Sequence, residues 1–428
     1  MRRSPVLHLL ATDAPQSVRA NFNRPQDPPV VVTPRSSSPR VLRICSTFEA
    51  PAGRSHKDAR FDPVGGMQNH TGELTRELDR RGVLQTVITA RRAGAPRRET
   101  LGRGATVFRL GLPVSRLRQL YAVPAAGLIP ASARRIDVVH AHLGEDLAVL
   151  PLAMLAARIG RAPLVITVHC SPRYTLTRVD LRSAVLKSLG GWIEGHAEAR
   201  AAAVIAITPR LADRLRAGGV DPERINVIPP GVNQSLFEGP FSRPLPDIEG
   251  RRVVYAGRLH RSKSVNTLVG AAKLMSSDAR VILVGDGPQR GALERSIEGL
   301  GLGDRIHITG FVPHDTVPGH LAHADVVVLP SVYEELGSVL LEAIHLGRPI
   351  VASDAGGIPG VIRHGENGLL VTPNDPAALG RGIDRVLGDP VLGAKLSDGA
   401  RRSASRYDWN QVTDKVLALY RSVIRDHR

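Results

Sequence analysis

Two glutamates and the backbone amides between them are the part of the chain best suited to binding a phosphorylated ligand. Glu334 and Glu342 lie on either side of the stretch Leu336 to Val339. If that stretch begins a helix, its unpaired N–H groups and the positive end of the helix dipole can hold a diphosphate. Glu342 could then accept hydrogen bonds from a ribose diol, and Glu334 could lie over a sugar beyond the phosphates. Alternatively, both are surface acids, because acidic residues commonly begin helices.

The residues around the two glutamates predict a βαβ unit that would position them. The apolar runs Val326 to Leu329 and Ile350 to Ala352 predict two buried strands. Between them an amphipathic stretch predicts a helix that ends at Gly347 and Pro349. Ligands of open α/β sheets bind outside the carboxyl ends of the strands, and the loop 331–338 lies at such an end.

The first half of the chain offers a glycine pair and a histidine at similar positions. Gly65 and Gly66 follow the strand predicted at Val41 to Thr47, where they allow backbone to approach a ligand or simply form a tight turn. His169 follows the apolar run Leu164 to Val168, so it points into a crevice or is a core histidine bonded to its neighbours.

Two more basic and polar groups have open interpretations. Lys263 is one of only six lysines among 57 basic residues, which favours a specific role over an exposed charge. His140 and His142 are separated by one residue, and this His-x-His pattern is a weak indication of a metal site. His70, on the helix expected after Gly66, is expected at the helix surface.

The order of residues in the second half resembles the donor-site signature of the retaining, family-4 glycosyltransferases with the GT-B fold. The matching series is Pro330-Ser331, Glu334, Gly337, Glu342-Ala343, Gly347-x-Pro349 and Gly356-Gly357-x-Pro359. The resemblance covers about residues 40 to 425. It implies an α/β chain of two Rossmann-like domains facing across a cleft, with a C-terminal helix that crosses back to the first domain.

The implied division of the chain follows its composition. Residues 1–39, rich in Pro, Arg and Ser, predict a disordered extension. An acceptor-side Rossmann-like domain is expected at 40–235 and a Pro- and Gly-rich linker at 236–250. The nucleotide-sugar-binding domain follows at 251–406, and the crossover helix at 407–428.

The resemblance also implies which residues act. Glu334 and His169 take the catalytic positions, where they contact the transferred sugar. The donor-binding positions are Gly65, Gly66, Arg258, Lys263, Val312, Leu336, Gly337, Ser338, Val339 and Glu342. In the family, Arg258 and Lys263 neutralise the leaving diphosphate without a catalytic metal, and no cofactor is expected. The family usually has glycine where this chain has Ser264.

Several shorter stretches resemble a narrower group, the aminoglycoside-antibiotic glycosyltransferases. They are FDPVGGMQ (61–68), TVHCS (167–171), VGDGPQR (284–290) and PSVYEELG (330–337). This group implies transfer of a hexose or N-acetylhexosamine, with GlcNAc from UDP-GlcNAc the first choice, to an aminocyclitol or aminoglycoside. Such polycationic acceptors need acidic partners, for which the loops offer Asp58, Asp62, Glu145, Asp146 and Asp180. An inositol, lipid-linked or cell-envelope acceptor is the alternative.

The composition limits the other partners. The formal net charge of +17 raises nucleic acid or an anionic membrane as partners. The charge is scattered, however, and aromatic residues make up only 4% of the chain. We therefore expect a nucleotide sugar and a small-molecule acceptor, with neither nucleic acid nor a membrane. Two cysteines exclude a disulfide framework, and no apolar run reaches the roughly 20 residues of a membrane helix, so a cytoplasmic protein is expected.

Overall fold

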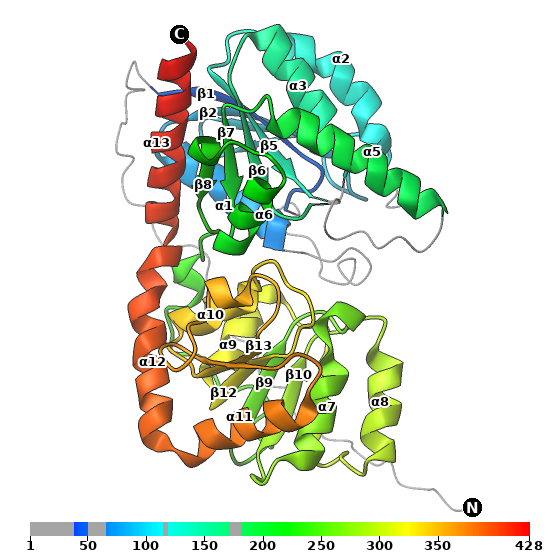
Figure 1. Ribbon diagram of the computed structural model, residues 1–428, viewed down its shortest axis with the longest axis vertical. Helices are drawn as coiled ribbons and strands as arrows, with labels where there is room; N and C mark the ends of the chain where they lie inside the picture. Colours follow the sequence, from blue (N-terminus) through cyan, green and yellow to red (C-terminus); the bar gives the residue numbers. More distant parts are fainter. Residues whose placement is uncertain (1–37, 50–65, 114–118, 145, 172–180) are drawn as a thin grey trace, which may run out of the picture. The chain divides into compact units, whose positions relative to one another are not determined.

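The computed structural model describes the backbone of residues 38–49, 66–113, 119–144, 146–171 and 181–428, and their side chains except those of 181–186. Within this part of the chain the strands form two sheets, one of eight strands and one of six (Figure 1). Each sheet belongs to one half of the chain, so the expected pair of Rossmann-like domains is confirmed. All but the last two residues of the predicted extension lie outside the described residues.

The first sheet has the strand order β3-β4-β2-β1-β5-β6-β7-β8. Only the β3–β4 pair is antiparallel among these pairings. The strands are β1 (Arg40–Cys45), β2 (Leu84–Ala90), β3 (Arg98–Leu101), β4 (Ala105–Leu110), β5 (Val138–Leu143), β6 (Leu164–Val168), β7 (Ala203–Ala206) and β8 (Ile225–Val227). Helices cover both faces of a parallel sheet, which is why every residue of β5 and β6 is buried.

Side chains alternate between the two faces of this sheet. Leu42 and Val139 lie in the core cluster on one face, and Val41 and Val138 lie in a second cluster on the other. The helices of this domain are α1 (Gly66–Arg80), α2 (Ala122–Ser132), α3 (Val149–Gly160), α5 (Leu181–Glu198) and α6 (Pro209–Ala217). Leu74 of α1 belongs to the second cluster, so α1 lies on the face of Val41.

The second sheet is parallel throughout, in the order β11-β10-β9-β12-β13-β14. Its strands are β9 (Arg252–Ala256), β10 (Arg280–Val284), β11 (Ile306–Gly310), β12 (Val326–Leu329), β13 (Ile350–Ser353) and β14 (Leu369–Val371). Its helices are α7 (Val265–Leu274), α8 (Arg290–Gly299), α9 (Val317–Ala322), α10 (Ser338–His345), α11 (Pro376–Gly388) and α12 (Pro390–Ala404). The predicted βαβ unit is thus β12, α10 and β13.

The last helix, α13 (Trp409–His427), returns to the first domain (Figure 1). Its apolar face, including Trp409 and Tyr420, shares a buried cluster with Val41 of β1 and Leu74 of α1. The Asp408 side chain caps the helix by accepting from the Asn410 amide at 2.8 Å. The expected C-terminal helix that crosses back to the first domain is therefore present. Among the helices of the described residues, none combines the length and apolar character that crossing a membrane requires.

Candidate active site

The loop after β12 leads into a helix whose first turn is open. Gly337 precedes α10 with φ 80°, a left-handed conformation that glycine adopts without strain. No side chain caps this helix start. Leu336 and Val339 are buried, whereas Ser338 is exposed. The first amides of α10 are therefore available to an anion, as the sequence predicts.

A turn at Gly356 and Gly357 packs against the loop 331–338 and holds its backbone in place. The Gly357 amide donates to the Glu334 carbonyl at 2.7 Å. A Cβ on Gly356 would lie 2.0 Å from the Glu334 oxygen, and one on Gly357 would lie 1.9 Å from the Glu335 oxygen. Only glycine permits this approach at either position, which explains the Gly-Gly pair of the sequence motif. The turn fixes where the Glu334 side chain begins.

Lys263 and Glu334 form an ion pair across two loops of the second domain. Lys263 ends a short 3₁₀ turn, Arg261–Lys263, between β9 and α7. The Val332 amide donates to the Ser262 carbonyl at 3.0 Å, which ties the same two loops together through the backbone. The side chains of Lys263 and Glu334 stay 25% and 18% exposed, so both can still be reached from solvent. The structure thus brings together two residues that the sequence predicts for the donor site.

Ser264 occupies the position where the family usually has glycine, and its backbone keeps the geometry that glycine favours. Its φ and ψ are 46° and 43°, in the left-handed region. The Ser264 hydroxyl bonds to Asn374 Oδ1 at 2.8 Å and to Thr267 Oγ1 at 2.9 Å. These bonds tie the Ser264 side chain to Asn374 and to the first turn of α7, and they help to hold the left-handed backbone before that helix.

Glu342 lies on α10 opposite a histidine that the sequence analysis missed. His314 Nε2 lies 3.5 Å from Glu342 Oε1. The bond to Glu342 raises the pKa of His314, against the opposing effect of desolvation. His314 follows the predicted donor-site residue Val312 by two positions, and Val312 is half-buried against the core. The signal available in the sequence was a polar side chain two positions after Val312, a residue predicted to bind the donor.

Gly66 approaches the same helix start from the first domain. A Cβ on Gly66 would lie 2.7 Å from the Ser338 hydroxyl. The structure therefore places the start of α1 beside the start of α10, as the predicted donor site requires. Gly65, the other member of the glycine pair, lies outside the described residues.

Arg258 lies on the loop after β9, with an exposed side chain. Its backbone carbonyl accepts from the buried Tyr255 hydroxyl at 2.8 Å. Desolvation, with a smaller effect of the Glu334 charge, raises the pKa of Tyr255, so the phenol stays protonated and keeps this bond. The loop is thus anchored by its backbone, while the guanidinium remains available to a ligand.

Two arginines of α6 contact the loop 331–338 and the turn at Gly356 that supports it, and the sequence analysis missed both. Arg210 Nη1 donates to the Gly356 carbonyl at 2.7 Å. Arg214 Nη1 donates to the Tyr333 hydroxyl at 3.0 Å and to Glu335 Oε1 at 3.3 Å. No local pattern identifies these partners, because they lie more than a hundred positions away along the chain.

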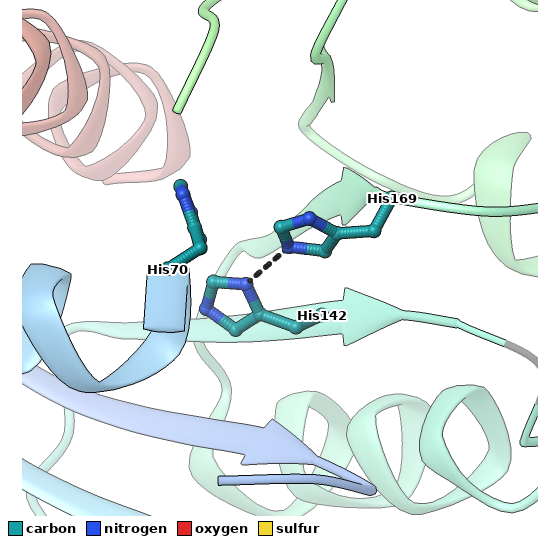
Figure 2. Close-up of side chains that lie close together, drawn as sticks. All are labelled: His70, His142 and His169. Carbon is teal, nitrogen blue, oxygen red and sulfur yellow. Dashed lines mark hydrogen bonds between the residues drawn. The ribbon is translucent and has the colours of Figure 1, made fainter. Parts of the chain in front are cut away.

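His169 is buried among two other histidines that come from different elements. Figure 2 shows His70 of α1, His142 of β5 and His169 at the end of β6 gathered in one place. His142 Nδ1 and His169 Nε2 are 3.2 Å apart, at hydrogen-bond distance. The His70 ring lies edge-on to the His169 ring, with centroids 4.7 Å apart. Burial, and then the nearby Arg43 charge, lower the pKa of His169 to about 3, so this ring is neutral at ordinary pH.

The expectation that His70 lies at a helix surface is wrong. His70 is only 5% exposed, because α13 covers this face and the centroid of the Trp409 ring lies 5.3 Å from that of the His70 ring.

His140, the first residue of the His-x-His pattern, is a core histidine that bonds to its neighbours through both ring nitrogens. Its Nδ1 bonds to the Tyr420 hydroxyl at 2.6 Å and its Nε2 to Thr167 Oγ1 at 2.7 Å.

The three-histidine cluster has the composition of a metal site. His70, His142 and His169 each offer a ring nitrogen within 4.8 Å of the others. Two features oppose a cation there. His142 and His169 use facing nitrogens to bond each other, and the Arg43 guanidinium lies 2.7 Å from the other His142 nitrogen. These features favour the expectation that no metal takes part, which stays a prediction.

The residues proposed to bind a polycationic acceptor are largely outside the described part of the chain. Asp58, Asp62, Glu145 and Asp180 all fall there. Asp146 is buried, and its Oδ1 accepts from the Ala148 amide at 2.8 Å, directly before α3. This bond gives Asp146 a part in shaping the turn, and its contact with an acceptor stays a prediction.

Comparisons with known proteins cover both domains. Residues 243–403 match the family model described as glycosyl transferases group 1, and residues 64–236 match the model described as Glycosyltransferase Family 4. Together the two models include every donor-site residue described above.

Two curated relatives represent different acceptor classes. The chain is 33% identical over 383 residues to a 2-deoxystreptamine N-acetyl-D-glucosaminyltransferase of Streptomyces fradiae, covering 83% of this chain and 89% of the relative. It is 31% identical over 405 residues to a D-inositol 3-phosphate glycosyltransferase of Acidothermus cellulolyticus, covering 85% and 87%.

Among solved structures, an Anabaena protein in complex with UDP-glucose has the same fold. Its TM-score to this chain is 0.66, at 22% identity, over 90% of this chain and 100% of that one.

Proposed function

The chain belongs to the glycosyltransferases of the group 1 and family 4 models, with the GT-B fold, and on that premise we propose that it transfers a hexose or N-acetylhexosamine from a UDP-linked donor to an aminocyclitol or aminoglycoside, with retention at the anomeric carbon. GlcNAc is the first choice of sugar. The observation that carries the donor site is the uncapped start of α10, flanked by Lys263 and Gly66.

The open helix start supplies the diphosphate site in this proposal. The first amides of α10 and the ammonium of Lys263 stabilise the charge that develops on the leaving diphosphate. Arg258 adds a second, exposed cation from the same loop as Lys263, between β9 and α7. Glu342 receives the ribose hydroxyls and His314 keeps its carboxylate oriented. The UDP-glucose complex of the Anabaena protein supports a uridine nucleotide.

The sugar lies between Glu334 and His169 in this proposal. Before the donor binds, Lys263 and Glu334 neutralise each other. Once a diphosphate attracts Lys263, the Glu334 carboxylate becomes free to accept a hydrogen bond from a sugar hydroxyl. His169 is neutral, so it can bond a hydroxyl without repelling positive charge that develops on the sugar.

The acceptor class rests on the relatives and on acidic loops. The Streptomyces fradiae relative supports an aminocyclitol. The Acidothermus cellulolyticus relative supports an inositol phosphate, which is the second candidate. These acceptors carry opposite charges, since one is a polyamine and the other a phosphate ester, so one comparison separates them.

The test is a transfer assay with the purified full-length chain. UDP-GlcNAc and UDP-glucose are each incubated with 2-deoxystreptamine, ribostamycin or inositol 3-phosphate, and products are weighed by mass spectrometry. We expect a sugar adduct on an aminocyclitol, with the α-configuration of the donor retained in its NMR coupling constants. An adduct only on inositol 3-phosphate would establish the second candidate, and a β-linked product would exclude retention.

Matched variants connect any product to this site. Glu334→Gln and Lys263→Ala are each expected to slow formation of the adduct strongly, Lys263→Ala by roughly 100-fold. Glu366→Gln, at an exposed ion pair with Arg363, and Lys273→Ala, on the surface of α7, are expected to leave it unchanged. If UDP binding measured by calorimetry survives while no acceptor reacts, the proposed acceptors are wrong. Absence of UDP binding would refute the donor site.

A further inference from the structure

A buried arginine lies behind the histidines of the site. Arg43 of β1 is 1% exposed, and its side chain is on the face of the sheet that α1 and α13 cover. Its Nη2 and Nε lie 2.7 and 3.3 Å from His142 Nε2. Its Nη1 reaches the Thr75 hydroxyl at 2.5 Å and the Gln85 side-chain oxygen at 3.4 Å. All of these acceptors are neutral, so the guanidinium makes its bonds without a carboxylate among them.

The chemistry of arginine sets the direction of the first hydrogen bond. A guanidinium has five N–H donors and no acceptor. His142 Nε2 must therefore accept from Arg43, which leaves this nitrogen without a proton. A neutral imidazole carries its one proton on the other nitrogen. His142 is consequently protonated at Nδ1.

The protonation of His142 then determines which atom donates in its hydrogen bond to His169. His142 Nδ1 lies 3.2 Å from His169 Nε2, and Figure 2 shows this bond between the two facing rings. Because His142 Nδ1 is the donor, His169 Nε2 is the acceptor. The proton of the neutral His169 ring must then lie on Nδ1. The ring keeps 9% exposure, so its remaining N–H can be offered to a ligand.

We propose that Arg43 and His142 are positioning residues that hold His169 as the Nδ1–H tautomer, so that His169 serves as a neutral hydrogen-bond donor to a hydroxyl of the transferred sugar. The final step, contact with the sugar, rests on the proposed function. The tautomer itself depends only on the hydrogen bonds of the free protein. No local pattern in the sequence signals this role, because His142 lies 99 positions from Arg43 along the chain.

Burial and charge keep both rings neutral. Desolvation lowers the pKa of His142 well below its ordinary value, and the nearby His140 and Arg43 lower it further. Protonation of either ring would place a second positive charge beside the buried guanidinium. Arg43 therefore orients the protons, and its charge adds to the desolvation that keeps an additional proton from binding. His169 consequently offers a donor and no positive charge where the sugar would become cationic.

A metal bound by the three histidines would contradict this arrangement. An ion coordinated by His142 Nδ1 and His169 Nε2 would need both nitrogens without protons. The hydrogen bond between them would then be absent. Metal analysis of the purified protein therefore distinguishes the two arrangements without any assay of activity.

The tautomer is measured directly by long-range proton–nitrogen NMR on full-length protein labelled with ¹⁵N-histidine. His169→Gln and His142→Gln samples assign the two rings. For the wild type at neutral pH we expect the Nδ1–H pattern for both. A wild-type His169 in the Nε2–H form, or stoichiometric zinc in the protein as purified, would overturn the proposal. This measurement needs no substrate, so it is independent of whether the transfer assay succeeds.

Two substitutions at Arg43 then test its part. Arg43→Met removes the donors and should leave a mixture of His169 tautomers. Arg43→Lys keeps a donor-only cation and should restore the Nδ1–H form at least in part. Arg109→Gln, which removes another buried guanidinium of the same sheet, is the control for lost packing. It should leave the His169 spectrum unchanged, and a Met variant with the wild-type spectrum would refute the role of Arg43.

Activity supplies a second readout once a product is known. Loss of an oriented donor should lower kcat by about tenfold, while KM for the nucleotide sugar changes less. Arg43→Lys should recover part of that loss. If the Met variant does not fold, the wild-type spectrum and the Lys variant still decide the proposal.

Discussion

The ammonium of Lys263 pairs with the carboxylate of Glu334, although the two residues come from loops that follow different strands of the second sheet. Each side chain is partly exposed. The Glu334 carbonyl accepts from the Gly357 amide of the next loop, and the carbonyl of Ser262, beside Lys263, accepts from the Val332 amide. A pair of opposite charges held this way can separate when a more highly charged ligand arrives. The donor site is therefore neutral at this point before binding, and its parts are already in position.

Removing Lys263 should weaken transition-state stabilisation more than protein stability. Lys263→Ala is expected to lower kcat/KM for the nucleotide sugar by roughly 100-fold, since one cation facing the leaving diphosphate is lost. The pair is partly exposed, so the melting temperature should change little. Steady-state kinetics and thermal melts check this, with Lys273→Ala as the control. A tenfold or smaller loss would place Lys263 outside the diphosphate site.

Gly356 should tolerate replacement by alanine far less well than Gly365, a glycine with a similar backbone conformation. Gly356→Ala would place a Cβ 2.0 Å from the Glu334 carbonyl, at φ 58°. Gly365→Ala has φ 76° but no atom within 4 Å of its Cβ, so it bears only the conformational cost of about 1 kcal/mol. We expect Gly356→Ala to cost about 2 kcal/mol more and to abolish activity. Chemical denaturation measures both variants, and equal costs would show that the contact with Glu334 is not limiting.

The approach of Gly66 to Ser338 predicts coupling between these residues. Gly66→Ala should lower the affinity for UDP, because its Cβ would lie 2.7 Å from the Ser338 hydroxyl. Removing that hydroxyl in Gly66→Ala/Ser338→Ala should recover part of the loss. Calorimetry on the four members of this double-mutant cycle gives the coupling energy. Gly127→Ala, with open space around its Cβ, is the control, and strict additivity would contradict the contact.

The buried histidines predict a loss of stability in mild acid. Desolvation is the first cause that lowers the pKa of His70, His140, His142 and His169. Below about pH 6.5 the unfolded chain binds protons that the folded chain does not. The free energy of unfolding should therefore decrease as the pH is lowered, by up to about 1.4 kcal/mol per pH unit for each such histidine.

His70→Gln isolates one contribution to this slope. The variant should lose less stability than the wild type between pH 7 and pH 5, by the equivalent of about one proton. Urea denaturation at several pH values provides the comparison. His427→Gln, at the exposed end of α13, should retain the wild-type slope. Parallel curves for wild type and His70→Gln would mean that His70 titrates similarly in the folded and unfolded chains.

Local patterns in the sequence determined the strands and the donor loop. The apolar run Val326 to Leu329 became β12 with the same bounds, because a strand buried on both faces must be apolar at each position. Gly337 and the start of α10 followed from signals within a few residues. The ordered series of residues from Pro330 to Pro359, with Glu334 and Glu342 among them, also identified the family. These features depend on neighbours along the chain, which sequence patterns report directly.

Only the tertiary structure decided which buried side chains are hydrogen-bonded to His169 and to one another. Parallel pairing of β1 with β5, and of β5 with β6, brings Arg43, His142 and His169 to one face of the sheet. The same packing buries His70 beneath α13, against expectation. Burial and hydrogen bonds of this kind depend on strand order and on which helix covers which face. Side chains far apart in sequence then set one another's protonation, and no local pattern carries that information.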